Sequence, residues 1–247
     1  MSNVIFDFSG DNFVITGASS GIGREITKKL ASAGATVLAI ARRKDKLEEL
    51  SIFNAKRIIP AVADVCDHDA MIGAISAFVA TYGKLSGSVH AAGLRAITPM
   101  KSFNVAQAHL IMDISFWAGV DFLQVVTKKR TSLDGASHIL FSSVYSTYAA
   151  KGMFAYNAAK SAVVSAIKTA AKEFAPRQRV NAVMPGWVQS EMTDELRKTS
   201  NIDEILSHEL LGEGKPSDVA EVVLFLLSSS ARWITGTSIA VDGGFLA

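Results

Sequence analysis

Residues 16–23 read Thr16-Gly17-Ala18-Ser19-Ser20-Gly21-Ile22-Gly23, between an apolar β-rich run at residues 13–16 and a helical pattern at residues 21–33. Glycine is needed where a chain turns sharply and where its backbone must approach a phosphate closely. The first turn of a helix then offers free N–H groups and the positive end of the helix dipole to an anion. The stretch therefore predicts a turn that binds the pyrophosphate of a dinucleotide, with a purely structural turn as the alternative. The residues expected to form this contact are Gly17, Ser19, Ser20, Gly21, Ile22 and Gly23.

Outward from this turn, short β-rich runs alternate with longer helical patterns. They predict strands at residues 13–16, 36–41, 57–63, 87–91, 138–142, 179–184 and 238–241, and helices at residues 21–33, 45–50, 68–82, 102–130, 153–174 and 217–227. The strand runs are almost continuously apolar, which indicates a parallel sheet that is covered on both faces. No linker or internal repeat divides the chain. Residues 1–247 are therefore expected to form a single Rossmann-type α/β domain, with a doubly wound seven-stranded parallel sheet flanked by helices.

The segment at residues 187–212 lies between the sixth predicted strand and the last predicted helix and mixes apolar residues with charges. Its apolar members are Trp187, Met192, Leu196, Ile205, Leu206 and Leu210. We interpret this segment as a helical flap over the substrate, and a plain surface excursion is the alternative.

The composition limits the classes of partner. Apolar residues make up 49% of the 247, and the formal net charge is only +2. Lys and Arg are scattered without a basic face, so no nucleic-acid partner is expected, and no metal site is expected either. No signal peptide and no apolar run long enough to cross a bilayer is evident, so no membrane partner is expected. The single cysteine, Cys66, cannot form an intramolecular disulfide and is expected to be buried, in a soluble cytoplasmic protein that acts on a small molecule.

Tyr156 and Lys160 lie one helical turn apart in a predicted helix, and Ser143 lies upstream of them. A phenol is a poor acid at neutral pH, with a reference pKa of about 10. An ammonium on the same helix face favours the phenolate, and a serine hydroxyl can hold a carbonyl oxygen near both groups. The three residues therefore predict a proton-delivery site for interconversion of a carbonyl and an alcohol. Taken alone, the Tyr-Lys spacing is also compatible with a chance pair on an exposed helix.

Arg42 and Arg43 follow the second predicted strand. In a dinucleotide-binding fold this position faces the adenosine ribose, where an acidic residue accepts hydrogen bonds from a 2′-hydroxyl and an arginine suits a 2′-phosphate. Arg42 therefore favours NADP (NADPH) as the cofactor, with NAD as the alternative, and Arg43 either assists or is solvated. Surface arginines that merely open a helix are the structural alternative.

Further landmarks occur in order along the chain. They are Ala63-Asp64-Val65, His90-Ala91-Ala92-Gly93, Pro185-Gly186-Trp187-Val188-Gln189-Ser190, Thr235-Gly236 and Val241-Asp242-Gly243-Gly244. Together with residues 16–23 and the Ser143, Tyr156 and Lys160 set, they make the chain resemble the classical short-chain dehydrogenase/reductases over essentially its full length. Its closest resemblance is to the ketoacyl-reductase-like members of that family.

The resemblance implies the remaining cofactor contacts and an assembly. Asp64 and Val65 are expected at the adenine, and Lys160 at the nicotinamide ribose. The other contacts that it implies come from Ala92, Gly93, Tyr156, Pro185, Gly186, Val188 and Ser190. The resemblance also implies a homotetramer, or a homodimer, and the predicted helices at residues 102–130 and 153–174 are apolar on more than one face, as a helix with a second partner would be.

Two departures from the family pattern affect the site. The family usually has Asn-Asn-Ala-Gly after the fourth strand, and here His90 and Ala91 replace both asparagines. A hydrogen bond that braces the sheet is expected to be lost or rerouted, with His90 either packed or acting as a substitute partner. By spacing, a catalytic asparagine of the family falls on Ser115, with Asp113 as the alternative. Since a backbone carbonyl holds the relay water there in the family, the relay is expected to survive, and Ser115 is a candidate catalytic residue.

These observations predict an NADP(H)-dependent oxidoreductase, a carbonyl reductase of this family that acts on CH–OH groups by hydride transfer. Tyr156 is expected to act as acid in reduction and as base in oxidation, while Ser143 polarises the substrate oxygen. The alternatives are a catalytically weakened NADP-binding regulatory or scaffolding protein of the same fold, and a sugar-nucleotide epimerase. The expected pocket is lined by residues 95–98 and 143–148 with Trp187 and Met192. This lining does not show whether the substrate is a ketoacyl thioester, a sugar, a steroid or a small ketone.

Overall fold

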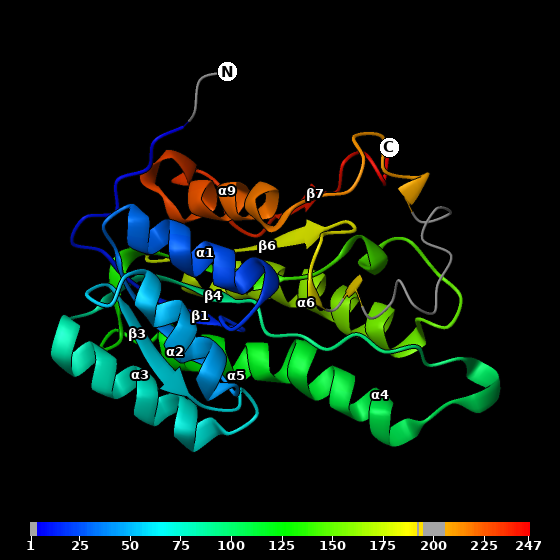
Figure 1. The fold of residues 1–247 in the computed structure, drawn as a ribbon, viewed down its shortest axis with the longest axis horizontal. Coiled ribbons are helices and arrows are strands. Elements are labelled where there is room, and N and C mark those ends of the chain that lie inside the picture. The colour runs from blue at the N-terminus through cyan, green and yellow to red at the C-terminus, as the bar shows by residue number, and fades with distance from the viewer. Residues whose placement is uncertain (1–3, 192, 195–205) are drawn as a thin grey trace.

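The computed structural model describes residues 4–191, 193–194 and 206–247. Within this part of the chain, the strands form one parallel sheet of seven in the order β3-β2-β1-β4-β5-β6-β7 (Figure 1). The strands are β1 (Asn12–Thr16), β2 (Thr36–Ala41), β3 (Ile58–Val62), β4 (Leu85–His90), β5 (Ser132–Phe141), β6 (Arg179–Pro185) and β7 (Ser238–Val241). The α-helices are α1 (Gly21–Ser32), α2 (Lys44–Phe53), α3 (His68–Tyr82), α4 (Val105–Met112), α5 (Ala118–Val126), α6 (Phe154–Phe174) and α9 (Pro216–Leu227). The expected fold class is confirmed.

Helices cover both faces of the sheet. One apolar core lies beneath α1, α2 and α9, with side chains such as Leu30, Leu50 and Val223, and Figure 1 shows α1 and α9 side by side. A second core lies beneath α3, α5 and α6, with side chains such as Ile75 and Ile167. Because the inner strands are buried on both faces, every residue of β1 and β2 is buried, which explains their continuous apolar sequences.

The strand order reverses between β1 and β4, which are neighbours in the sheet. In open parallel sheets, the connections that leave the carboxyl ends of strands on either side of such a reversal diverge and leave a crevice. The turn at residues 16–23 leaves β1 at this edge, and Ala91, Ser143 and Gly186 come shortly after β4, β5 and β6. The topology therefore brings segments that are far apart in sequence to one edge of the sheet.

Three expectations about local structure were wrong. Strand β5 begins at Ser132 rather than at residue 138, since it pairs with β4 at Leu85 and, after a shift in register, again from Gly87. Helix α5 ends at Val126 rather than at residue 130, because the chain turns there. The thiol of Cys66 is exposed rather than buried.

The helical segment from Val105 to Val126 is continuous, with α4 joined to α5 by a π-helical turn, η2 (Asp113–Trp117). It starts at Val105 because the side chain of Asn104 accepts a hydrogen bond from the Gln107 N–H. By length and composition alone, its 22 residues could cross a membrane, because an 18-residue window within them has a mean hydropathy of 1.3. Half of this window is buried in the domain, so packing against the sheet and α6 accounts for its apolar composition.

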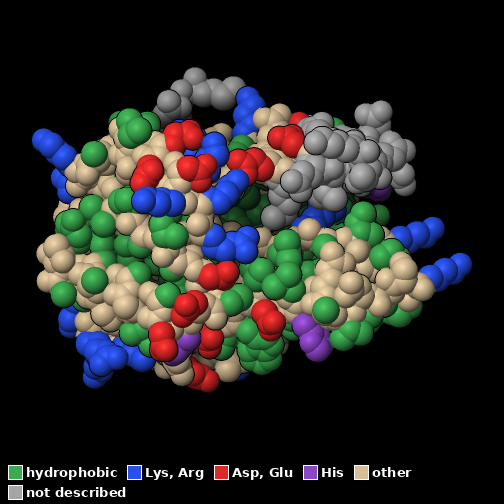
Figure 2. All heavy atoms as spheres, turned by 60° about the horizontal axis from the view of Figure 1, so that its bottom comes forward, with side chains coloured by type: hydrophobic (Ala, Val, Ile, Leu, Met, Phe, Trp, Pro, Cys, Tyr) green, Lys and Arg blue, Asp and Glu red, His purple; other side chains and the backbone are tan. Residues whose placement is uncertain are grey.

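The described surface carries charges of both signs. On the face drawn in Figure 2, Lys and Arg side chains alternate with Asp and Glu side chains rather than gathering in one basic area. Described ion pairs such as Arg24–Glu49 and Lys29–Glu221 join such neighbours. This face therefore lacks the basic stripe that nucleic-acid binding requires.

Candidate active site

The turn between β1 and α1 requires glycine for steric reasons. Gly17 has a φ of +67°, and a Cβ at this position would lie 2.8 Å from the backbone carbon of Ala91. A Cβ on Gly23 would collide with the carbonyl oxygen of Gly17. These contacts hold the start of α1 tightly against the end of β1 and the segment that follows β4.

The first turn of α1 is suited to an anion. Ser20 occupies the N-cap position, but its side chain does not cap the helix, and the first turn contains no acidic residue. The N–H groups at this end and the positive end of the helix dipole therefore remain available. The phosphate-binding turn that the sequence predicts has the local structure that this role needs.

A groove of about 480 Å³ runs from this turn past the ends of β2 and β3. Its lining includes Arg42, Arg43, Asp64 and Val65, as expected, and also Glu191. The Arg42 side chain is 70% exposed and forms a loose ion pair with Asp64, at 3.8 Å. Arg43 is held more firmly, since it donates to the Ser19 hydroxyl over 3.1 Å and to the Glu191 carboxylate over 2.6 Å. Both arginines thus face the groove, and Arg43 is tied directly to the turn between β1 and α1.

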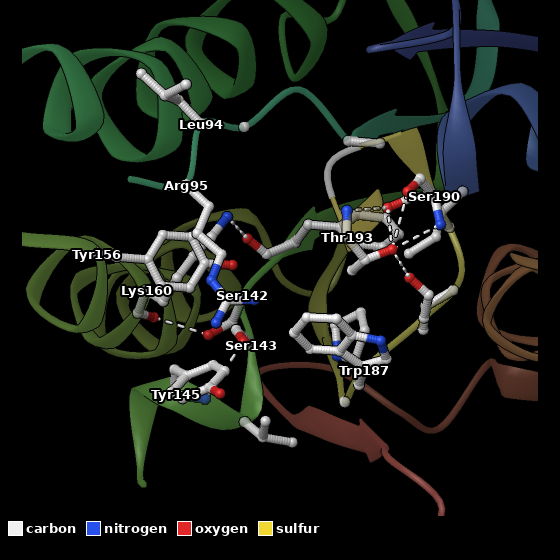
Figure 3. A pocket seen from close by; sticks show the side chains of 18 of the residues that line it. Leu94, Arg95, Ser142, Ser143, Tyr145, Tyr156, Lys160, Trp187, Ser190 and Thr193 are labelled. Carbon is white, nitrogen blue, oxygen red and sulfur yellow. Dashed lines mark hydrogen bonds between the residues drawn. The ribbon is translucent and has the colours of Figure 1, made fainter. Parts of the chain in front are cut away.

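The three expected catalytic side chains meet in a smaller cavity of about 140 Å³, which adjoins this groove. Ser143 follows β5, and Tyr156 and Lys160 come from the first two turns of α6. Each of the three is buried, with exposures of 6%, 9% and 4%. Figure 3 shows Tyr156, Lys160 and Ser143 together on one side of the cavity and Trp187 opposite them. Gly93 and Ser190 line both the cavity and the groove, so the two spaces are continuous.

The protonation of Tyr156 is set by opposing effects. Burial raises the pKa of the phenol, while the positive charge of Arg95 and a hydrogen bond with Ser143 act to lower it. Burial lowers the pKa of the Lys160 ammonium to about 8, and its Nζ donates to the carbonyl oxygen of Phe141 over 2.9 Å. The phenol therefore keeps its proton at neutral pH, as a general acid must. The expected effect of Lys160 on the pKa of Tyr156 stays a prediction.

Arg95 is the main feature of the cavity that the sequence did not predict. Residues 95–98 were expected in the pocket wall, but nothing in the sequence indicated that the Arg95 guanidinium stacks among aromatic rings. Its Cζ atom lies 4.9 Å from the ring centroid of Tyr145, 5.4 Å from that of Trp187 and 5.9 Å from that of Tyr156.

Ser115 lies within the π-helical turn and is 2% exposed. Its hydroxyl contacts the N–H and the carbonyl oxygen of Leu94, both at 3.4 Å. A Cβ on Gly93 would lie 3.5 Å from Nζ of Lys160 and 3.9 Å from the Ser115 hydroxyl, so both groups converge on Gly93. Single π-helical turns are frequent at functional sites. The structure therefore brings Ser115 toward Lys160, while Asp113 is exposed.

His90 replaces the missing asparagine as a brace. Its Nδ1 lies 3.0 Å from the Thr16 hydroxyl, and its Nε2 lies 3.4 Å from the carbonyl oxygen of Ile114. The ring is 2% exposed, and burial lowers its pKa to about 4. His90 is therefore both a packed side chain and a substitute hydrogen-bond partner, the two roles that the sequence left open. Its ring connects β1 to the π-helical turn.

The buried His90 leads to a prediction about stability. The unfolded chain binds a proton on this residue below pH 6.5, whereas the folded chain does so only near pH 4, so stability is lost as the pH falls through this window. Between pH 7.5 and pH 5.5 the loss from this one group is about 1.4 kcal/mol. In His90→Asn, which has no titratable group at this position, the fall in unfolding free energy between these two pH values is expected to be smaller by that amount. Urea unfolding at both pH values measures it, and an identical fall in both proteins would contradict the assignment.

The loop after β6 closes the cavity. Pro185, Gly186, Val188 and Ser190, for which the resemblance implies cofactor contacts, all line it, and Met192 lies outside the described residues. A buried carboxyl group supports this loop: Glu209 accepts a hydrogen bond from the Trp187 N–H through Oε1. Burial raises the pKa of Glu209 to about 7, and the nearby charge of Asp242 acts in the same direction. The sequence gave no signal for Glu209, because its contact is made to a backbone group.

The expected flap at residues 187–212 is described only at its two ends. Residues 195–205 fall outside the described part, so the flap stays a prediction there. Near the C-terminal end of the segment, His208 packs against Tyr148 and Phe245, with ring centroids 6.1 and 5.5 Å apart. This end therefore contacts the outer aromatic wall of the cavity.

Comparisons with known proteins bear on the same residues. A family model described as enoyl-(acyl carrier protein) reductase matches residues 17–246. The 3-oxoacyl-[acyl-carrier-protein] reductase FabG of Thermotoga maritima is 33% identical, over 94% of this chain and 96% of that protein. Galactitol 2-dehydrogenase (L-tagatose-forming) of Cereibacter sphaeroides is 34% identical, over 98% of this chain and 97% of that protein. A short-chain dehydrogenase/reductase structure from Brucella melitensis, described as glucose/ribitol dehydrogenase, superposes with a TM-score of 0.93 at 28% identity, over 98% and 99% of the two chains.

Proposed function

This chain belongs to the short-chain dehydrogenase/reductase family, and from that premise we propose that it is an NADP(H)-dependent oxidoreductase that interconverts a carbonyl and a secondary alcohol. The observation that carries the proposal is a convergence. Ser143, Tyr156 and Lys160 meet at one end of a continuous cleft, and Arg42 and Arg43 line its other end. The relatives of this chain include one protein named as a reductase and one named as a dehydrogenase. Reduction of a carbonyl and dehydrogenation of an alcohol are the same reaction in opposite directions.

The residues along the cleft fit a dinucleotide phosphate. The uncapped first turn of α1 would hold the pyrophosphate, and Arg42 with Arg43 would hold the 2′-phosphate. At the other end, Tyr156 and Lys160 would contact the nicotinamide ribose, beside Pro185 and residues 186–190. When bound, the cofactor supplies or accepts the hydride.

The side chains of the cavity would handle the proton. Ser143 donates a hydrogen bond to the substrate oxygen, which is worth a few kcal/mol as negative charge develops there. Tyr156 then transfers its proton to that oxygen, and burial keeps the phenol protonated beforehand. In oxidation the same phenol oxygen takes the proton back.

The proton of Tyr156 must be replaced after each turnover. Lys160 and Ser115 converge on Gly93, which lines the cavity, and they define the route that we propose for this proton. The Ser115 hydroxyl donates to the carbonyl oxygen of Leu94 and accepts from its N–H, which holds the side chain beside this route.

Ser115 is expected to support the relay without limiting it. Losing a side-chain hydrogen bond costs about 0.5–1.5 kcal/mol, which corresponds to a rate change of roughly tenfold or less. Ser115→Asn and Ser115→Ala should therefore each change kcat by no more than about tenfold. A wild-type protein that is inactive on every carbonyl, but active after Ser115→Asn, would instead favour the regulatory reading.

A homotetramer is the assembly that we propose. Trp117, Val105 and Phe154 are 54%, 57% and 57% exposed, on the α4–α5 segment and at the start of α6. Phe122 and Val163, which also lie on α5 and α6, pack into the core of the domain instead. Light scattering at micromolar concentration is expected to give four times the mass of the chain, with a dimer as the lesser form, and a monomer would refute the proposal.

The activity itself is tested by mixing the protein with NADPH and each member of a panel of carbonyl compounds. The decrease in NADPH absorbance measures the rate of reduction. Ketoacyl thioesters, sugars, steroids and small ketones should be included, because the cavity lining does not separate them. Consumption of NADPH that depends on one class of carbonyl is the expected result, and no consumption with any class would contradict the proposal. A cytoplasmic location stays a prediction, which the free thiol of Cys66 agrees with.

A further inference from the structure

The cavity is lined by a second cation besides Lys160. Arg95 follows β4 in the segment after Gly93, and its guanidinium lies among the rings of Tyr145, Tyr156 and Trp187. Figure 3 shows the side chain reaching from the Leu94 segment into the space between Tyr156 and Trp187. The three rings around the guanidinium restrict its movement.

The hydrogen-bond donors of Arg95 are poorly used within the protein. Its Nε is buried and has no hydrogen-bond partner. Among the described residues, the ion pairs join other side chains, and none involves Arg95. Ring faces attract the charge, but they do not replace the oxygen acceptors that a guanidinium with five N–H groups can bind. A preoriented planar fork of this kind matches a carboxylate, which it can bind through two parallel hydrogen bonds.

The position of Arg95 determines where such a carboxylate would lie. The guanidinium carbon is 5.9 Å from the ring centroid of Tyr156, and both residues line the same cavity of about 140 Å³. A short acid in this cavity can therefore place its carboxylate at Arg95 and its carbonyl at Ser143 and Tyr156. The aromatic wall of Tyr145, Trp187 and Phe245 leaves apolar surface for the rest of the molecule.

We propose that Arg95 makes this enzyme selective for small oxo acids, with a carboxylate one or two carbons from the reacting carbonyl, an inference that rests on the proposed function. In the reduction, the carbonyl carbon gains the hydride, the carbonyl oxygen gains the proton of Tyr156, and NADPH becomes NADP⁺. The carboxylate is unchanged, and the product is the 2- or 3-hydroxy acid. Arg95 is thus a specificity-determining residue, while Ser143 and Tyr156 act on the reacting atoms.

The test compares acids with their own methyl esters, which carry the same ketone without the charge. Pyruvate and acetoacetate are each paired with their methyl ester, and kcat/KM is measured with NADPH. Wild-type enzyme is expected to prefer the acid of at least one pair by tenfold or more. Arg95→Gln should lower kcat/KM for that acid about 10- to 100-fold more than for its ester, the range for charge-assisted hydrogen bonds, because the effect of Arg95 on the pKa of Tyr156 applies to both substrates. Arg95→Lys keeps the charge but lacks the planar fork of the guanidinium. Its kcat/KM for the acid should lie between the values of the wild type and of Arg95→Gln.

Arg232→Gln is the matched control, because Arg232 is exposed and precedes β7 at the opposite edge of the sheet. It should behave as the wild type with every substrate. An enzyme that reduces acids and esters equally well, or an Arg95→Gln variant that keeps the acid preference, would overturn the inference while leaving the proposed function intact. Equal losses of NADPH affinity and acid kcat/KM in Arg95→Gln would assign Arg95 to the cofactor and would overturn it too.

A binding measurement separates this inference from the activity. Trp187 stacks on Arg95, so its fluorescence should respond when acetoacetate binds, at constant ionic strength and without NADPH. The response should be absent with methyl acetoacetate and absent in Arg95→Gln. If no carbonyl compound of the whole panel is turned over, the proposed function fails, and this measurement still decides the role of Arg95. Equal responses to acid and ester, or no response to the acid, would then reject it.

Discussion

Replacing Tyr156 by phenylalanine is expected to lower kcat for carbonyl reduction by at least about 100-fold, the lower end of what a positioned general acid contributes. The substitution removes only the hydroxyl group, and the ring is buried between α6 and the cavity, so its packing is retained. NADPH affinity should remain close to that of the wild type, because the groove residues at α1, Arg42 and Arg43 are untouched. Steady-state kinetics and NADPH fluorescence titration measure the two quantities separately.

The matched control for this prediction is Tyr82→Phe. Tyr82 is 41% exposed and is the last residue of α3. It lies near the start of β4, whereas the cavity lies at the carboxyl ends of the strands. Its hydroxyl is expected to be dispensable, so its kcat should equal that of the wild type. A Tyr156→Phe enzyme that kept a tenth or more of the wild-type rate would show that another group delivers the proton.

Replacing Arg42 by aspartate is expected to weaken NADPH binding by about 10- to 100-fold and to favour NADH. In the proposed site the arginine would pair with the 2′-phosphate, whereas an aspartate would repel it and accept hydrogen bonds from the 2′-hydroxyl of NADH. Stability should change little, because the Arg42–Asp64 pair is exposed and its atoms are 3.8 Å apart. Titration of both proteins with both cofactors gives the ratio of affinities.

Two further variants sharpen this prediction. Arg130→Asp makes the same charge change at an exposed position after α5 and should leave the ratio of affinities unchanged. Arg43→Gln removes the arginine that is tied to Ser19 and Glu191. If Arg43→Gln shifts the ratio and Arg42→Asp does not, the 2′-phosphate belongs to Arg43. Equal affinities of the wild type for NADPH and NADH would contradict both assignments.

The parts of this protein that the sequence predicted are those that depend on backbone geometry. Gly17 and Gly23 indicated a tight turn between β1 and α1, where a Cβ on either residue would collide with backbone atoms. The apolar runs indicated a covered parallel sheet because β1 and β2 are buried on both faces. The spacing of Tyr156 and Lys160 indicated a shared helix face because one helical turn separates them. Each of these signals is local, so it survives without knowledge of the tertiary structure.

The parts that the sequence did not predict depend on contacts between distant segments. Arg95 and Trp187 belong to different loops, and only the fold stacks them. Glu209 supports the loop after β6 through a backbone N–H, which leaves no trace in the residue types. His90 was recognised as a departure, but its link to Ile114 depends on where the π-helical turn presents that carbonyl.

The measurement that tests hydride transfer most directly follows the hydrogen itself. A carbonyl compound accepted in the panel is reduced with NADPH that carries two deuterium atoms at C4 of the nicotinamide, and the alcohol is analysed by mass spectrometry. One deuterium is expected on the carbinol carbon of every product molecule formed by the wild type, with almost no product from Tyr156→Phe. An alcohol whose carbinol hydrogen comes from the solvent, or labelled product formed equally well by Tyr156→Phe, would contradict the account.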